Sequence, residues 1–413
     1  MEVYLVGGAV RDALLGREVT ERDWVVVGGT AEALTAQGFR PVGRDFPVFL
    51  HPDTHEEYAL ARRERKTGPG YRGFVTEFTP DIPLVEDLRR RDLTINAMAR
   101  DADGQLVDPY DGRADLDARW LRHVSDAFRE DPVRILRAAR FAARFAPLGF
   151  RVHPDTLSLL REMVAAGEAD ALVAERVWQE TERALGEARP DVFFQVLRDC
   201  GALRVIFPEV DRLFGVPQPE RWHPEIDTGV HVLKCLEQAA ALSPAARMRF
   251  AVLTHDLGKG VTSPDRWPSH HGHEGSGLPL LAALCDRLRV PNAYRELAKL
   301  VCRFHGNVHR AFELKSSTVL DLLEACDALR RGERFGDFLL ACEADARGRT
   351  GLEQRDYPQR DYLLRCRAAV AAVALDETER NRFNGPAYGQ ALRRKRLAAL
   401  EPLRPAAVAT TGG

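Results

Sequence analysis

The amino-acid sequence predicts an α+β protein in which a small mixed sheet comes first and a long all-helical region follows. Up to about residue 110, short apolar runs of strand length alternate with helix-sized segments. After about Ser125, strand-like runs become rare and apolar residues recur at three- and four-residue spacing, which is the period of an amphipathic helix. At roughly 150 residues per domain, the 413 residues of the chain suggest about two to four domains.

The first region contains short apolar runs that read as strands, with helix-sized segments between them. The expected strands are Val3–Val6, Trp24–Val27, Pro47–Leu50 and Glu57–Ala61, and the expected helices are Ala9–Leu15 and Thr30–Gln37. The first two strands each end in Gly-Gly. The segment from Thr67 to Gly73 holds three glycines and a proline, so we expect a loop there.

The second region reads as helices almost throughout. Its first expected helices are Asp131–Phe145, Pro154–Ala166, Ala174–Leu185 and Asp191–Cys200, and prolines stand at or next to the starts of two of them. A proline-rich stretch from Val216 to Pro224 indicates a linker or a domain edge. Helical periodicity then runs from about Thr228 to about Leu400, and residues 405–413 have the composition of a tail.

Composition indicates a soluble globular protein. Hydrophobic residues make up 45% of the chain and charged residues 29%, which excludes a disordered protein. No apolar run approaches the roughly 18 residues that span a bilayer, and the N-terminus does not read as a signal peptide, so we expect a cytoplasmic protein with no membrane partner. The seven cysteines contain no CxxC pair, so we expect reduced, mostly buried thiols rather than a zinc or redox site.

Arginines are unevenly distributed although the formal net charge is only −2. They crowd three short stretches of the first 150 residues, within residues 62–72, 89–91 and 129–144. Such clusters form either a solvated polar surface or a basic surface that meets phosphates.

Two motifs near the N-terminus predict a site for phosphates and a metal ion. In Leu5-Val6-Gly7-Gly8-Ala9-Val10-Arg11-Asp12, a strand runs into two glycines and a helix. Gly8 lets backbone N–H groups approach a triphosphate, and Arg11 adds a positive charge. Glu21 and Asp23 stand two residues apart at the edge of the next strand, so their carboxylates point the same way and suit Mg²⁺. A structural turn and an exposed acidic turn are the alternative interpretations.

Two further motifs supply charged groups for the same kind of site. In Arg90-Arg91-Asp92-Leu93-Thr94-Ile95-Asn96-Ala97, Arg91 can pair with phosphate, while Asp92 or Asn96 can hydrogen-bond a ribose hydroxyl; a helix start capped by Asp92 is the alternative. In Glu130-Asp131-Pro132-Val133-Arg134 the polar residues continue to Arg137 and Arg140. An amphipathic helix explains the periodicity of this segment, but it leaves unexplained why its polar face is almost only arginine.

A different motif predicts a second metal site. Thr254-His255-Asp256-Leu257-Gly258-Lys259-Gly260 follows an apolar run, and His231 lies about one helix upstream, a combination that suits a divalent metal with mixed nitrogen and oxygen ligands. Histidines are dense from residue 255 to residue 305, at 255, 270, 271, 273 and 305. One or two of them can touch substrate or metal, although His305 and His309 can equally lie on a helix surface.

The first four motifs, in this order and spacing, closely resemble the class II tRNA nucleotidyltransferases (CCA-adding enzymes) and their bacterial poly(A) polymerase relatives. The motif around His255 resembles the HD phosphohydrolase superfamily. Together the resemblance covers the whole chain and looks like the bacterial multifunctional CCA proteins with a C-terminal HD domain. It implies a small mixed-sheet nucleotidyltransferase head, an all-helical neck and body, and a helical HD domain.

The resemblance implies a role for each motif residue in adding CTP and ATP to the 3′ end of tRNA without a nucleic-acid template. Gly8 and Arg11 hold the triphosphate, Glu21 and Asp23 bind catalytic Mg²⁺, and Arg91 and Asp92 contact phosphate and ribose; Asp131 and Arg134 read the Watson–Crick edge of the base, and Arg137 and Arg140 complete the nucleotide contacts. The family usually has two aspartates where this chain has Glu21 and Asp23. Glutamate keeps the same ligand atoms, so we expect metal binding to survive.

For the HD domain the resemblance implies a divalent transition metal such as Ni²⁺ and hydrolysis of phosphate esters at nucleotide ends. The expected ligands are His231, His255, Asp256 and Asp345. The implied activities are 2′,3′-cyclic phosphodiesterase, 2′-nucleotidase and phosphatase, which would prepare a damaged tRNA terminus for repair.

The expected domains are the head at 1–125, a helical neck and body for nucleobase and tRNA binding at 126–222, the HD domain at 223–350 and a helical tail at 351–413. The expected partners are tRNA, CTP and ATP, and the chain is expected as a monomer or homodimer. Three alternatives stay open: a poly(A) polymerase-like transferase, a CCA-adding enzyme with an inactive HD domain, and a phosphohydrolase whose head has become an RNA-binding module.

Overall fold

The computed structural model describes residues 1–42, 48–66 and 74–404. The loop expected at 67–73, which contains Arg72, lies outside the described residues. Pro47, the first residue of an expected strand, and the tail at 405–413 lie outside them as well. The chain divides into two compact units, Met1–Ile206 and Phe207–Gly413, and each is described by itself. Among the described residues, no helix combines the length and the apolarity needed to cross a membrane.

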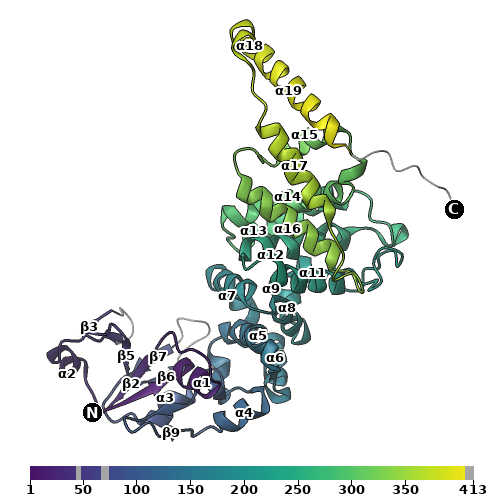
Figure 1. Ribbon diagram of the computed structural model, residues 1–413. Helices are drawn as coiled ribbons and strands as arrows, with labels where there is room; N and C mark the ends of the chain where they lie inside the picture. The colour runs from purple at the N-terminus through teal and green to yellow at the C-terminus, as the bar shows by residue number, and fades with distance from the viewer. Residues whose placement is uncertain (43–47, 67–73, 405–413) are drawn as a thin grey trace. The chain divides into compact units, whose positions relative to one another are not determined.

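The first unit is built on a mixed sheet (Figure 1). Within the described residues this sheet has seven strands, in the order β3 (Arg40–Pro41), β4 (Val48–Leu50), β5 (Glu57–Leu60), β2 (Asp23–Val27), β1 (Glu2–Val6), β8 (Ala99–Arg100) and β9 (Leu106–Val107). Strands β2 and β5 are parallel, whereas β1 pairs antiparallel with both β2 and β8. The expected small mixed sheet is therefore confirmed.

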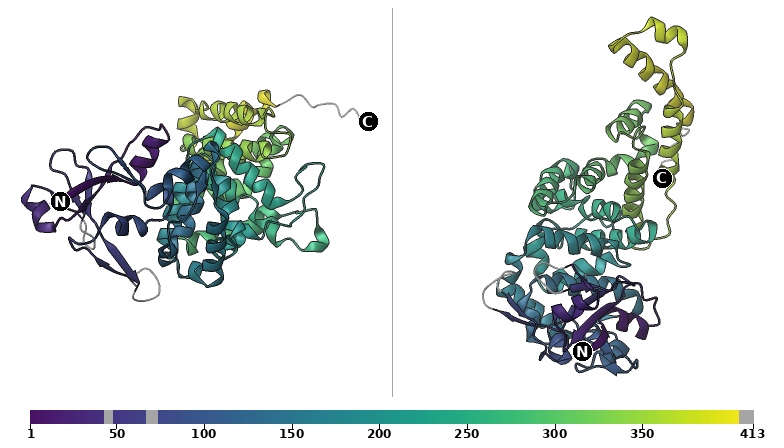
Figure 2. Two further views of the ribbon diagram at one scale, coloured as in Figure 1. Left: turned by 90° about the horizontal axis from the view of Figure 1, so that it is seen from below. Right: turned by 90° about the vertical axis from the view of Figure 1, so that its left-hand side faces the viewer.

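Both faces of the sheet are covered by apolar side chains. Val25 and Val26 are successive residues of β2 and point to opposite faces. Val25 packs in a cluster with Leu84 and Leu88 of α3 (Leu84–Arg89), and Val26 packs with Leu34 of α2 (Ala31–Ala36). The unit also contains α1 (Gly8–Leu14), α4 (Gly112–Ala118) and a two-stranded ribbon of β6 (Arg63–Lys66) and β7 (Phe74–Glu77), which extends from the sheet in Figure 2.

The register of β1 and β2 brings the first two sequence motifs to one place. Val6, the last residue of β1, pairs with Asp23, the first residue of β2. The chain then turns at Gly7, whose φ of 70° lies in the left-handed region that favours glycine. The glycine turn and the carboxylate of Asp23 therefore lie at the same edge of the sheet.

Helices complete the first unit, and α5 lies at their centre. They are α5 (Val133–Phe145), α6 (Pro154–Ala165), α7 (Ala174–Gly186), α8 (Pro190–Asp199) and α9 (Ala202–Ile206). Helix α5 packs against α7 and α8. Ile135, Leu136 and Ala139 are fully buried on it, as the expected amphipathic pattern requires.

The second unit is helical within its described residues. Its longer helices are α11 (Thr228–Leu242), α12 (Ala246–Thr254), α13 (His273–Arg287), α14 (Asn292–His309), α15 (Ser316–Ala325), α16 (Gly332–Arg347), α17 (Pro358–Ala371) and α19 (Pro386–Leu400), with the short helices α10 (Pro208–Asp211) and α18 (Glu377–Arg382). Helices α11, α12, α14 and α16 form one packed group, and they are labelled in Figure 1. They form the core that holds the second site.

The α+β class with a helical remainder is confirmed, while several elements differ from the prediction. Glu21 is not on a strand, because β2 begins at Asp23. Helix α3, helix α4 and the two-residue strands β3, β8 and β9 were not expected, because such short elements carry too few residues to show a period. The proline-rich stretch from Val216 to Pro224 lies inside the second compact unit, where Pro217 pairs with Asp227 in an isolated bridge. The division into four domains stays a prediction.

Candidate active sites

The first unit contains a polar cleft of about 1160 Å³ in which the four N-terminal motifs meet. Its lining combines glycines with many arginines and with carboxylates. Among the lining residues are Gly7, Gly8, Arg11, Glu21, Asp23, Arg90, Arg91, Asp92, Asn96, Glu130, Asp131, Arg134, Arg137, Arg140, Arg144 and Arg176. Every residue that the sequence assigned to a nucleotide or to Mg²⁺ therefore lines one cleft, and Arg176 joins them from a helix that carried no such assignment.

The glycine turn leaves room for the arginines behind it. A Cβ atom on Gly7 would lie 2.9 Å from Nη1 of Arg91, so a side chain here would displace that guanidinium. Arg11 is 3% exposed, and its Nη1 donates to Oδ1 of Asn96 at 2.6 Å. The strand-turn-helix segment thus places one arginine directly and makes space for a second.

Glu21 and Asp23 supply the acidic side of the cleft. Burial raises the pKa of Asp23 and the charge of Glu21 raises it further, while Arg91 acts in the opposite direction. Two carboxylates that line a cleft together with many arginines are a donor set that a hard divalent cation satisfies. The residues present therefore fit Mg²⁺.

The buried carboxylate of Asp92 joins the motif at residues 90–97 to α5. Asp92 is 7% exposed; its Oδ1 accepts from Nδ2 of Asn96 at 3.1 Å, and its Oδ2 accepts from Nε of Arg137 at 2.8 Å. Burial alone would raise the pKa of Asp92, but Arg137 and the hydrogen bonds outweigh burial and hold it at about 2. Asp92 is thus ionised at neutral pH and fixes Arg137 in the cleft.

The residues expected to read the base already have protein partners. Asp131 is held by Arg176 of α7, with Nη1 donating to Oδ1 at 3.1 Å and Nη2 donating to Oδ2 at 2.8 Å. The guanidinium of Arg134 donates to the carbonyl oxygens of Ala127 and Arg90, both at 2.6 Å. These bonds fix the direction in which the carboxylate and the guanidinium face the cleft.

Arg140, the last predicted arginine, is oriented from α7 as well. Its Nε donates to Oε2 of Glu180 at 2.7 Å, and both side chains are buried. Neither Arg176 nor Glu180 was expected from the sequence. The helix Ala174–Gly186 reads as an ordinary amphipathic segment, so only its contact with α5 gives these two residues a role.

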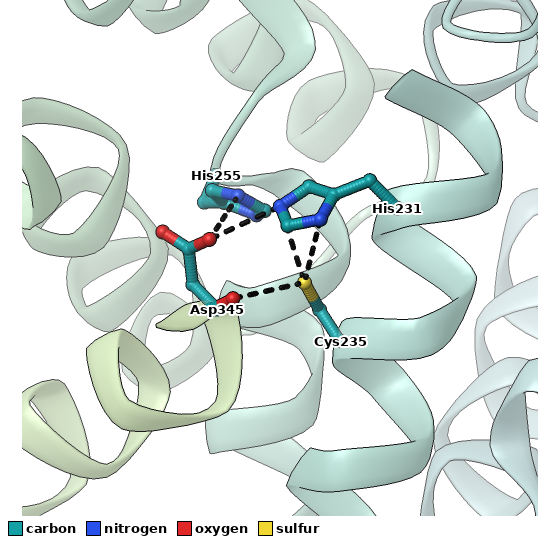
Figure 3. A group of neighbouring side chains, drawn as sticks. All are labelled: His231, Cys235, His255 and Asp345. Atoms are coloured by element: carbon teal, nitrogen blue, oxygen red, sulfur yellow. Dashed lines mark hydrogen bonds and ion pairs between the residues drawn. The ribbon is translucent and has the colours of Figure 1, made fainter. Parts of the chain in front are cut away.

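The second unit brings the expected HD residues together in a buried cluster (Figure 3). His231, His255 and Asp345 offer ligand atoms within 4.8 Å of one another, together with Cys235. Oδ1 of Asp345 lies 3.1 Å from Nε2 of His231 and 3.7 Å from Nε2 of His255. The aspartate from α16 therefore meets the histidines of α11 and α12.

Cys235 is part of this cluster although the cysteines were expected to play no part in a metal site. Its Sγ lies 3.4 Å from Nε2 of His231. The i and i+4 positions of His231 and Cys235 on one helix are the signal that could have identified it. All seven cysteines are free and buried, as expected.

Asp256, the fourth expected ligand, stands between His255 and two other histidines. Its Oδ2 lies 3.1 Å from Nε2 of His255 and 2.7 Å from Nζ of Lys259. Its Oδ1 faces His273 and His305 instead. His305 is 5% exposed, so the alternative that placed it on a helix surface is wrong.

Residues outside the cluster hold its histidines in place. Oε1 of Glu225 lies 2.9 Å from Nδ1 of His231, which leaves Nε2 facing Asp345. Nε2 of His309 lies 2.6 Å from Oδ2 of Asp345, and its Nδ1 lies 2.8 Å from the hydroxyl of Tyr357. Carboxylate and hydroxyl partners of this kind orient metal-ligating histidines. His309 is therefore not a plain surface residue either.

The charges of the cluster favour a cation at its centre. Burial lowers the pKa of His255, but Asp256 and Asp345 outweigh burial and raise it to about 9. Within the described residues, Nε2 of His255 and both carboxylate oxygens of Asp256 are buried without a hydrogen bond of good geometry. Buried imidazole and carboxylate groups in this arrangement fit a divalent transition metal.

The chain matches three known families along its length. Residues 3–122 match the Poly A polymerase head domain, residues 149–214 match the family described as probable RNA and SrmB-binding site of polymerase A, and residues 228–332 match the HD domain.

Proteins of similar sequence include multifunctional CCA proteins. A multifunctional CCA protein of Thioalkalivibrio sulfidiphilus is 66% identical over 98% of this chain and 99% of its own length. A multifunctional CCA protein of Methylococcus capsulatus is 63% identical over 98% of this chain and 96% of its own length.

Solved structures share the fold. The apo form II of a CCA-adding enzyme has a TM-score of 0.68 at 21% identity and covers 98% of this chain and 88% of its own. The Thermotoga maritima CCA-adding enzyme complexed with tRNA-CCA has a TM-score of 0.64 at 20% identity, covering 97% of this chain and 87% of its own.

The pair of Asp92 and Arg137 yields a prediction about stability. A double-mutant cycle of Asp92→Asn and Arg137→Met should give a coupling energy of about 1–2 kcal/mol at pH 7, because a charged hydrogen bond is broken beside a partly exposed guanidinium. Since the folded-state pKa of Asp92 is lowered to about 2, this stabilisation is present above the ordinary pKa and is lost as the pH falls from about 4 to about 2. Urea denaturation at pH 7 and pH 3 measures it. A coupling near zero at pH 7, or one unchanged at pH 3, would contradict the assignment.

Proposed function

We propose, because the chain belongs to the multifunctional CCA protein family, that it adds and repairs the 3′-terminal CCA of tRNA from CTP and ATP without a nucleic-acid template. We also propose that its HD domain hydrolyses phosphate esters at nucleotide ends. The observation that carries the first proposal is the cleft in which Glu21 and Asp23 face the arginines of α5.

The cleft residues suit nucleotidyl transfer by positioning and charge. In the proposed reaction the 3′ hydroxyl of tRNA attacks the α-phosphate of the nucleotide, and pyrophosphate leaves. Mg²⁺ held by Glu21 and Asp23 would activate the hydroxyl and stabilise the leaving group. Arg11 and Arg91 lie beside the glycine turn and would hold the triphosphate, while Asp92 would accept from a ribose hydroxyl. Fixing the reactants in this way supplies much of the rate enhancement of phosphoryl transfer.

Asp131 and Arg134 would select the base. The exocyclic amino groups of cytosine and adenine donate, and the ring nitrogens beside them accept, so a carboxylate and a guanidinium match both bases. Guanine and uracil present the opposite pattern at these atoms and would meet like partners. Arg176 holds Asp131 through two hydrogen bonds, which supports a rigid template made of protein.

The second cluster would hydrolyse a phosphate ester. A divalent metal such as Ni²⁺, held by His231, His255, Asp256 and Asp345, would activate water and polarise the phosphate. Lys259 lies beside the cluster, with Nζ 2.7 Å from Asp256, and its charge can stabilise a phosphate. The expected substrates are 2′,3′-cyclic phosphates, 2′-nucleotides and phosphomonoesters.

Loss of the acidic pair should abolish transfer. With Mg²⁺, CTP, ATP and a tRNA transcript lacking CCA, the chain should add C, C and A and then stop, resolved at single-nucleotide resolution. Asp23→Asn should lower the rate by at least about a hundredfold, because a metal ion contributes several kcal/mol to the barrier, whereas Glu21→Asp should retain activity. Asp53→Asn, an exposed aspartate of the same unit, is the control. An open-ended ladder of A would instead indicate a poly(A) polymerase, and no extension would exclude the proposal.

Loosening Asp131 should reduce base selection. Arg176→Ala should lower kcat/KM for CTP and ATP by about tenfold, equivalent to about 1.4 kcal/mol, and should increase the incorporation of UTP and GTP. Arg176→Lys keeps the charge but not the two-point contact, so it should rescue only part of the loss. Arg113→Ala, which breaks an exposed ion pair, serves as the control. Unchanged selectivity for the base in Arg176→Ala would contradict a role of Arg176 in base selection.

Removing two HD residues should separate the activities. The double variant His255→Ala/Asp256→Ala should lose hydrolysis of 2′,3′-cAMP, assayed with Ni²⁺ or Co²⁺, and should keep CCA addition. Hydrolysis that persists in this variant would contradict the assignment. A wild-type chain that is silent with every metal tried would favour the CCA-adding enzyme with an inactive HD domain.

A further inference from the structure

A pocket of the second unit lies beside the buried cluster that contains Asp345. Its volume is about 730 Å³, within the roughly 300–1,000 Å³ of pockets that take small molecules. Lys259 and His309 are part of its lining, and they contact Asp256 and Asp345 at 2.7 and 2.6 Å. A molecule that fills this pocket therefore reaches the residues that the proposed hydrolysis uses.

Apart from its histidines, the pocket carries a net positive charge. Its lining contains four basic side chains and two carboxylates, namely Lys259, Arg310, Arg349, Arg355, Glu274 and Glu313. Surfaces on which one sign of charge prevails attract ligands of the opposite sign. The pocket therefore suits an anion such as a nucleotide.

The lining also contains an exposed tryptophan, Trp222. All five tryptophans of the chain lie within the described residues, and Trp222 is the one that is exposed. Its exposed fraction is 55%. An aromatic ring in contact with water gains free energy when a flat apolar surface covers it. Trp222 thus offers binding free energy that the polar lining cannot supply.

Neighbouring residues fix the backbone at Trp222. The N–H groups of Trp222 and His223 both donate to the carbonyl oxygen of Pro219, at 2.9 and 3.0 Å. The ring of His223 packs edge-on against that of His231, with the ring centroids 4.6 Å apart. Trp222 is therefore held one residue away from a side chain that contacts the cluster.

A positive charge covers part of the indole ring. Cζ of Arg221 lies 4.8 Å from the ring centroid of Trp222, where a guanidinium is attracted by the ring. A planar ring has a second face, and stacking on aromatic faces is how proteins hold nucleobases without selecting their sequence. The arrangement of cation, aromatic ring and basic pocket is suited to a nucleobase that carries a phosphate nearby.

We propose that Trp222 stacks on the nucleobase of a nucleotide or RNA end whose phosphate lies at the HD cluster. The pocket would then select nucleotides over phosphate esters that lack a base. The base subsite stands on the pocket and the exposed ring; its effect on hydrolysis rests on the proposed hydrolytic function.

The first test compares two substrates with the same reacting group. One is 2′,3′-cAMP, and the other is the 2′,3′-cyclic phosphate of methyl riboside, which has no base. Trp222→Ala should raise KM for 2′,3′-cAMP by at least about fivefold, because base stacking is lost. Its kcat should stay within about twofold, since stacking holds the ground state and the transition state equally. Both constants for the substrate without a base should be unchanged.

Two further variants control this comparison. Trp222→Phe keeps a smaller flat ring and should recover part of the loss. Tyr388→Ala removes another exposed aromatic side chain of the same unit, which does not line the pocket, and should behave as the wild-type chain. An equal rise of KM for both substrates in Trp222→Ala, or no rise for either, would overturn the proposal.

The second test measures binding without hydrolysis. The full chain is stripped of metal with a chelator and titrated with adenosine 2′-monophosphate while tryptophan fluorescence is recorded. Trp222→Phe keeps the other four tryptophans, so the difference between the two chains reports Trp222 alone. A base stacked on the indole should quench this difference signal. Equal quenching in the two chains would contradict the base subsite.

The two tests together separate the two proposals. Quenching of Trp222 in a chain that hydrolyses nothing with any metal would support the base subsite and contradict the proposed hydrolytic function. Hydrolysis of 2′,3′-cAMP that is unchanged in Trp222→Ala would support that function and contradict the base subsite.

Discussion

The free-energy cost of burying charge is the constraint on which both candidate sites depend. A buried charged group destabilises a fold unless it is paired and hydrogen-bonded. In the first unit, Arg134 and Arg140 are 8% and 7% exposed on α5, and each is bound by oxygens from other segments. These pairings fix α5 against the end of α3 and against α7, so the groups that hold the fold together also define the cleft.

The second unit meets the same constraint with histidines. Asp256 and Asp345 are buried among imidazoles, and the pKa of each carboxyl is held well below its ordinary value because the charges of His255 and other neighbours outweigh burial. Glu225 and Tyr357 bind the outer nitrogens of His231 and His309. The inner nitrogens are thereby turned toward the carboxylates. Many metal-ligating atoms therefore lie close together, on side chains whose orientations are fixed by their neighbours.

The sequence predicts the fold class and the short motifs well, because each motif is a continuous segment with its own chemistry. It does not predict the partners, which lie far along the chain. Asp131 meets Arg176 across 45 residues, and His231 meets Asp345 across 114 residues. Asp345 was found through the resemblance, whereas Arg176 and Glu180 lie on a helix whose pattern resembles any amphipathic segment. The convergence of His273 and His305 on Asp256 depends on the packing of α13 and α14, which no local pattern encodes.

Taken together, the two sites give the proposed enzyme complementary chemistries on the same end of an RNA. In the proposed function, one site would make a phosphodiester bond to a 3′ hydroxyl, and the other would remove phosphates that block such a hydroxyl. The chain matches both the Poly A polymerase head domain and the HD domain, so the domains that would carry the two proposed chemistries belong to one protein. The residues of each candidate site lie within one compact unit.

The most direct test uses a shortened tRNA in two forms, one ending in a 2′,3′-cyclic phosphate and one ending in a free 3′ hydroxyl, each incubated with CTP, ATP, Mg²⁺ and Ni²⁺. The account predicts that the wild-type chain removes the phosphate and then completes CCA. The variant His255→Ala/Asp256→Ala should extend only the tRNA with a free 3′ hydroxyl. The variant Asp23→Asn should remove the phosphate without extending the tRNA. Extension of the blocked tRNA by His255→Ala/Asp256→Ala at the wild-type rate, or failure of the wild-type chain on both tRNAs, would contradict it.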